Sequence, residues 1–137
     1  MFNFNRTNKK SALDFLQKKD IDVAQAYRTR NVNSLTEFCS RNAVNAIRND
    51  IKRHMADNTE FCGCLNGTND KYTAEKCLTR KYEVISEDDN KCIIKRLVSF
   101  KNTKIAGIAV KINEDFSEIF TILKSENGFV IDSVVAA

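Results

Sequence analysis

The sequence has no proline, no tryptophan, one histidine and four glycines in 137 residues. The glycines stand apart, so no glycine-rich phosphate loop is present. A lone histidine, His54, without a nucleophile placed beside it predicts no catalytic triad. No window approaches the roughly 18 apolar residues of a membrane-spanning helix, and residues 1–10 lack the apolar run of a signal peptide. We therefore expect a cytoplasmic protein, unless a leader or anchor was removed.

Concentrated positive charge is also missing. The chain has 22 lysines and arginines against 18 acidic residues, a net charge of +4. Its longest basic runs are pairs, such as those at residues 9–10, 18–19 and 52–53. Nucleic-acid-binding domains usually gather basic residues on one face, so we predict no nucleic-acid partner. Solvated surface charge is the favoured interpretation, and weak peripheral association with an anionic membrane is left open.

The five cysteines are an odd number, which fits poorly with a closed disulfide framework and predicts free thiols in a reducing compartment. Cys62 and Cys64 form one close pair, with His54 upstream and Cys77 and Cys92 downstream. Structural zinc sites usually present two close pairs of ligands, and only one pair is present here. We therefore predict no metal and no cofactor.

The first half of the chain has helical periodicity. Ser11 followed by Asp14 is typical of a helix N-terminus, and a shared apolar face follows, made of Leu13, Leu16, Ala24 and Tyr27. Asp20 interrupts that face, which predicts a break or bend at residues 19–22. Residues 28–33 are polar and are expected to form a turn.

A second helix start is predicted at Ser34, because Glu37 three residues later completes a capping box. Apolar residues then recur at three- and four-residue steps: Leu35, Phe38, Cys39, Ala43, Ala46, Ile47 and Ile51. This spacing predicts an amphipathic helix to about Met55, with a kink near Ser40 left open. Residues 57–71 are polar and contain two glycines, which predicts a loop.

The second half changes to the two-residue period of half-buried strands. Strands are predicted at residues 78–84, 91–100, 104–112, 117–124 and 129–135, with turns at 88–90, 101–103, 113–115 and Asn127-Gly128. Links of three to five residues require antiparallel pairing, because parallel strands need long crossovers.

Helices that precede a block of strands predict an α+β fold, with two to three helices packed on one face of an antiparallel sheet of four to five strands. We expect a flexible tail at residues 1–10. The remainder, residues 11–137, has the usual size of a single domain.

Two segments resemble the nuclear transport factor 2-like superfamily. Residues 24–38 (AQAYRTRNVNSLTEF) look like the opening of such domains, and residues 118–122 (EIFTI) and 128–134 (GFVIDSV) look like their last two strands. The pattern is most similar to the membrane-associated domain of the mitochondrial import-motor anchor and its bacterial relatives. The resemblance covers residues 12–135 and implies a cone, in which a curved sheet and the helices enclose a pocket. Family members include isomerases, dehydratases, small-ligand binders and scaffolds, so function must be argued from the site.

Strand phase supplies the candidate pocket residues. Arg80 shares its phase with Leu78, Tyr82 and Val84, and Arg96 shares its phase with Cys92, Ile94, Val98 and Phe100. Buried arginine needs an anion, so a pocket that binds a carboxylate or phosphate is one hypothesis. Its predicted lining is Tyr27, Arg80, Tyr82, Arg96 and Phe120.

Two alternatives to this pocket stay open. Both arginines could pair with acidic residues of the chain itself, or the strand could present its other face, because Ile93 and Leu97 are also apolar. Isomerase-type chemistry would need Tyr27, Tyr82 and Asp132 to converge, and no catalytic residue is predicted.

These observations favour a binding or scaffolding module that acts through the face of its sheet, as a homodimer or with another protein. The alternative is a binder of a small anionic ligand, or an isomerase- or dehydratase-type enzyme, that uses the pocket implied by the resemblance.

Overall fold

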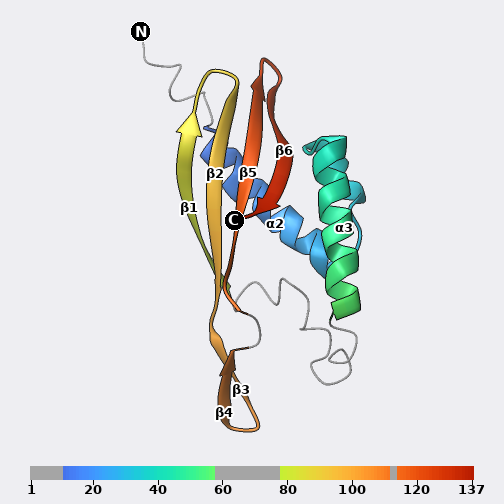
Figure 1. The fold of residues 1–137 in the computed structure, drawn as a ribbon, viewed down its shortest axis with the longest axis vertical. Helices are drawn as coiled ribbons and strands as arrows, with labels where there is room; N and C mark the ends of the chain where they lie inside the picture. Colours follow the sequence, from blue (N-terminus) through green and yellow to red (C-terminus); the bar gives the residue numbers. More distant parts are fainter. Residues whose placement is uncertain (1–10, 58–77, 112–113) are drawn as a thin grey trace.

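Helices occupy the first part of the chain and strands the second (Figure 1). The computed structural model describes residues 11–57, 78–111 and 114–137. Its elements are α2 (Ala12–Thr29), the 3-10 helix η1 (Asn33–Glu37), α3 (Arg41–Asp57), β1 (Leu78–Glu87), β2 (Lys91–Phe100), β3 (Asn102–Ile105), β4 (Ile108–Lys111), β5 (Phe116–Ser125) and β6 (Gly128–Ala136). The predicted tail at residues 1–10 and residues 58–71 of the predicted loop lie outside this description.

The predicted α+β class is confirmed. Strands β1, β2, β5 and β6 form an antiparallel sheet in the order β1-β2-β5-β6, and two α-helices pack with it. In Figure 1, α2 crosses behind this sheet and α3 lies beside β6. The core lies between the helices and one face of the sheet, with Leu16 and Ile47 from the helices and Ile94, Phe120 and Ile131 from the strands. The cone shape stays a prediction.

Helix α2 begins where the sequence predicts, because the Ser11 Oγ accepts a hydrogen bond from the Asp14 N–H at 3.0 Å. It ends at Arg30, whose backbone is left-handed with φ 57°. The predicted break at residues 19–22 is wrong: the helix is continuous, and Asp20 is fully buried. A carboxylate on an apolar helix face is tolerated when the facing sheet supplies a cation.

The predicted capping box at Ser34 and Glu37 is also wrong. Residues 33–37 form the 3-10 helix η1, whose N-terminus has no side-chain cap. The chain then leaves the helical conformation at Phe38 before α3 begins. The single helix expected from Ser34 is therefore divided near Ser40, where the sequence had left a kink open.

The reason for this division is a short backbone pairing with β6. The Ile131 N–H donates to the Phe38 carbonyl and the Ser40 N–H donates to the Ile131 carbonyl, both at 2.9 Å, so Cys39 lies parallel to β6. The Ser40 Oγ then accepts from the Ala43 N–H at 3.1 Å and caps α3. Pairing with the sheet over three residues thus outweighs the local helical preference.

Strands β1 and β2 form the hairpin that the sequence predicts. The Asp88 Oδ1 accepts from the N–H groups of Asn90 and Lys91, at 2.7 and 2.9 Å, and this Asx-type turn connects them. The predicted phase of β2 is confirmed, since Cys92, Ile94, Arg96, Val98 and Phe100 are all buried. The inverted-face alternative is therefore wrong. In β1 the predicted phase ends early, because Val84 is exposed and the register shifts between Val84 and Ser86.

The strand predicted at residues 104–112 is wrong. Asn102 to Lys111 instead fold as a separate two-stranded hairpin, β3–β4, so residues 102–103 of the turn predicted at 101–103 lie in a strand. Ala106 and Gly107 form its two-residue turn with φ of 53° and 83°. This geometry is the mirror-image turn that suits the twist of a hairpin, and it is typical of a residue followed by glycine. The hairpin predicted at Asn127-Gly128 forms between β5 and β6, but its turn lies one residue earlier, at Glu126-Asn127, because Ser125 pairs with Gly128. Of the two predicted residues, only Gly128 has a positive φ, 123°.

Replacing Ser40 tests the corrected helix boundary. We expect Ser40→Ala to lower the free energy of unfolding by about 1 to 2 kcal/mol, because the cap of α3 and a hydrogen bond to the Asp132 carbonyl are lost. Ser34→Ala is the matched control, and its effect should stay within about 0.5 kcal/mol. Urea unfolding of both variants measures the difference. A larger loss for Ser34→Ala would contradict the assignment.

Candidate functional site

The predicted pocket arginine Arg96 is completely buried and is held by two carboxylates. Its Nη1 bonds Asp20 Oδ1 on α2, and its Nη2 bonds Glu118 Oε1 on the neighbouring strand β5. The guanidinium also lies over the ring of Phe120, 4.7 Å from the ring centroid. Glu118 lies directly opposite Arg96 in the β2–β5 register, which explains why these two side chains meet.

Asp20 connects α2 to two strands. Besides Arg96, its Oδ2 accepts a hydrogen bond from the Tyr82 hydroxyl at 2.7 Å and lies 3.3 Å from the Arg80 Nε. Arg80 and Tyr82 belong to β1, where their shared phase turns both side chains toward the helix. One helical carboxylate therefore holds β1 and β2 at the same point.

The cluster of Asp20, Arg80, Tyr82, Arg96 and Glu118 is formally neutral, because its two guanidinium groups face two carboxylates. Burial, followed by the charge and hydrogen bond of Asp20, raises the pKa of Tyr82 well above its ordinary value of 10.0. The tyrosine therefore remains a protonated donor at physiological pH. Both arginines therefore pair with acidic residues of the chain itself, which is the first of the two alternatives to the anion pocket.

Four of the five predicted pocket residues thus converge: Arg80, Tyr82, Arg96 and Phe120. The fifth, Tyr27, lies elsewhere and donates from its hydroxyl to Asp50 Oδ2 at 2.5 Å. The two tyrosines considered for isomerase chemistry therefore bond different carboxylates. Asp132 lies on β6, and its backbone carbonyl accepts hydrogen bonds from the Ser40 Oγ and the Asn42 Nδ2.

Sequence reasoning missed both carboxylates of the cluster. Asp20 carries a signal, since an acidic residue on an otherwise apolar helix face needs a buried cation, but the same pattern also predicts a break in the helix. Glu118 shares the buried phase of Phe120 and Ile122 on β5, which is the same signal in a strand. Matching these two acids to two in-phase arginines would have predicted the cluster.

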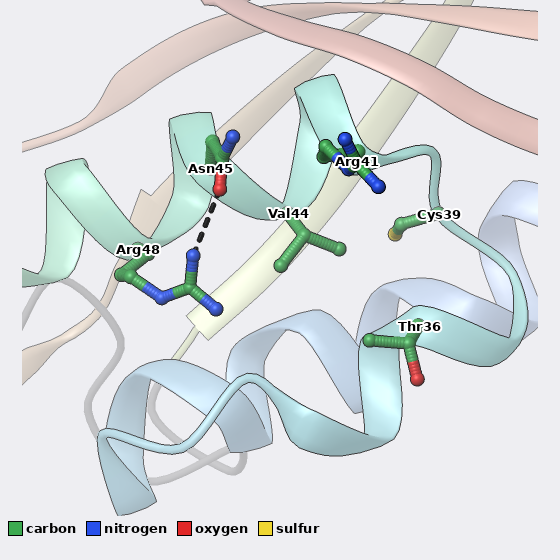
Figure 2. A pocket seen from close by; sticks show the side chains of 6 residues that line it. All are labelled: Thr36, Cys39, Arg41, Val44, Asn45 and Arg48. Carbon is green, nitrogen blue, oxygen red and sulfur yellow. Dashed lines mark hydrogen bonds between the residues drawn. The ribbon is translucent and has the colours of Figure 1, made fainter.

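A hollow of about 420 Å³ lies between η1 and α3, away from the cluster (Figure 2). Its lining is Thr36, Cys39, Arg41, Val44, Asn45 and Arg48. Arg48 donates from Nη1 to Asn45 Oδ1 at 2.8 Å, and none of the lining residues is acidic. Burial raises the pKa of the Cys39 thiol to about 12, so this sulfur is a protonated thiol and a poor nucleophile.

The second surface of interest is the outer face of the sheet, the face turned away from α2 (Figure 1). We define it by the outward positions Thr79, Lys81, Glu83, Lys91, Ile93, Lys95, Leu97, Ile119, Thr121, Leu123, Val130, Ser133 and Val135. No helix of the described residues lies on it. Val135 is 55% exposed and Leu123 is 38% exposed, so aliphatic side chains meet solvent there.

Metal and membrane features give no further site in the described part of the chain. No group of three or more His, Cys, Asp or Glu residues could hold a metal ion among residues 11–57, 78–111 and 114–137. Cys62, Cys64 and Cys77 lie outside these ranges. None of the described helices is long and apolar enough to cross a membrane.

Comparison of the chain with models of known protein families, with curated proteins and with solved structures found no match.

Replacing Asp20 tests the structural role of the cluster. We expect Asp20→Asn to lower the free energy of unfolding by about 3 to 5 kcal/mol, because Arg96 would be left buried without one of its anions. Asp22→Asn, two residues away on the exposed face of α2, should change stability by less than about 0.5 kcal/mol. Chemical unfolding of the two variants provides the comparison, and equal effects would refute this role.

The raised pKa of Tyr82 predicts a specific loss of stability in alkali. The unfolded state releases the phenol proton near pH 10 while the folded state retains it, so stability falls as pH rises through this range. Tyr82→Phe has no such proton. The stability advantage of the wild type over Tyr82→Phe should therefore shrink between about pH 9 and pH 11. An advantage that stays constant over this range, measured by urea unfolding, would show that the Tyr82 pKa is not raised.

Proposed function

We propose that this chain is a binding and scaffolding module that acts by protein–protein contact through the outer face of its sheet. The observation that carries the proposal is the row of aliphatic side chains on that face, with Leu123 and Val135 exposed. Exposed apolar patches on otherwise polar proteins typically mark interaction surfaces.

The neutral cluster supports a surface role over an internal pocket. An anionic ligand that reached Arg96 would have to displace Asp20 or Glu118, and a displaced carboxylate would stay in the interior without its cation. The inward positions of the sheet are filled by buried side chains, among them Ile94, Val98 and Phe120. The polar groups of the interior therefore serve the fold.

The occupant that fits this face best is a second copy of the chain. Three cross-strand pairs of β5 and β6 form an uncharged area on the outer face: Ile119 with Val135, Thr121 with Ser133, and Leu123 with Val130. Two identical areas of this kind can stack without opposing like charges. Each aliphatic side chain that becomes fully buried contributes roughly 1.5 to 3 kcal/mol, against the entropy lost on association.

Binding of a small anion is the second candidate function, and one observation favours it. The hollow between η1 and α3 presents Arg41 and Arg48 and has no acidic residue in its lining. An anion there would leave the neutral cluster intact.

Native mass spectrometry tests the proposed function. We expect the wild type to appear as an assembly of two or more 15.6 kDa chains. The double variant Leu123→Lys/Val135→Lys should show half the mass of the wild-type assembly, because lysines would face each other across the contact. Ile21→Lys is the control, since Ile21 is 53% exposed on α2, and it should keep the wild-type mass.

A wild type that stays monomeric, or an assembly that the double variant leaves intact, would contradict the proposed contact. A small anion that is released from the wild type on denaturation, and is absent from Arg48→Ala, would instead support the second candidate.

A further inference from the structure

The two edges of the sheet differ. The β6 edge is occupied near its middle, where Phe38 and Ser40 exchange backbone hydrogen bonds with Ile131. At the opposite edge of the sheet, β1 pairs only with β2 within the described residues. A free strand edge presents unpaired N–H and C=O groups and is a template for another strand.

The outward side chains along β1 carry opposite charges two positions apart. Lys81 and Glu83 are both exposed, and they flank Tyr82. On the β2 side, Glu83 lies opposite Lys95, whereas Lys81 lies opposite the apolar Leu97. Glu83 therefore has a cation as its cross-strand neighbour, and Lys81 has no acid in the same position.

Symmetry restricts how two β1 edges can pair. In an antiparallel pair, two residues directly opposite each other point to the same face of the sheet. A two-fold axis between two identical strands must therefore lie between the two copies of one residue, so that this residue faces its own copy. An axis at Lys81 would place two lysines opposite each other, and an axis at Glu83 would oppose two glutamates. An axis at Tyr82 places Lys81 of each copy opposite Glu83 of the other.

We infer that a second copy of this chain binds at the β1 edge, antiparallel and centred on Tyr82. The pairing runs from Arg80 to Val84 on each copy and ends at the register shift between Val84 and Ser86. It supplies Lys81 with the acid that β2 lacks. It also gives Glu83 a lysine on both sides, Lys95 within the chain and Lys81 of the second copy.

This contact is separate from the proposed stacking of outer faces and does not rest on it. It uses backbone groups and two outward charges, while the side chains of Arg80 and Tyr82 remain turned inward on Asp20. Two four-stranded sheets would become one continuous sheet, whose outer faces lie side by side. With both contacts present, edge pairing would extend the assembly within the plane of the sheet, whereas face stacking would add a second sheet on top of it.

A charge-swap experiment in the Leu123→Lys/Val135→Lys background tests the inference, because face stacking is removed there. The Kd of self-association is measured by sedimentation equilibrium for this parent, for added Lys81→Glu, for added Glu83→Lys and for both together. Each single change opposes like charges at two symmetric positions and should raise Kd about tenfold. The double swap restores opposite charges and should return Kd to the parent value.

Lys91→Glu in the same background is the control for net charge, since Lys91 lies at the far end of β2, and it should leave Kd unchanged. A monomeric parent would overturn the inference, and so would a double swap that fails to recover the affinity lost in the single variants. Failure of the face contact is recognised separately in native mass spectrometry: the Leu123→Lys/Val135→Lys variant would then have the same assembly mass as the wild type.

Discussion

The carboxylate of Asp20 is the interaction on which this structure depends. It lies on the apolar face of α2, fully buried, and it bonds Arg96 of β2 and Tyr82 of β1. Arg96 in turn forms an ion pair with Glu118 of β5. A helix and three strands are thereby fixed at one neutral point. Because a buried ion is costly without its counter-ion, replacing any one of these charged side chains is expected to destabilise the fold strongly.

This neutrality has a consequence for function. Within the described residues, the charged side chains of the cluster bind one another, and this supports the proposal that recognition occurs at the surface. The outer face carries aliphatic side chains, with Val135 55% exposed, and β1 carries exposed Lys81 and Glu83, the charges on which the proposed edge contact is based. Both features belong to the same sheet. Among the described residues, the cluster holds α2 against the inner face, and no helix lies on the outer face.

Hydrophobic periodicity predicted the elements that obey a single local rule. The α2 cap at Ser11, the buried phase of β2 and the hairpin at Gly128 all follow from side-chain spacing and turn preference. The predictions from sequence are wrong where a residue distant in the chain determines the local structure. Ser40 leaves the helix to pair with β6, and Asp20 remains in its helix because Arg96 faces it. The carboxylates of the candidate site were not predicted for the same reason: the phase of Arg96 can be read from the sequence, but its partners Asp20 and Glu118 lie 76 and 22 residues away.

A double-mutant cycle between Asp20→Leu and Arg96→Met tests the central claim most directly. Urea unfolding of the wild type, the two single variants and the double variant gives the coupling energy of the pair. We predict a coupling of about 1 to 3 kcal/mol, with the double variant clearly more stable than the sum of the single losses implies. Strictly additive losses would show that the two residues do not stabilise each other, and would contradict the account of the fold as organised around one neutral buried cluster.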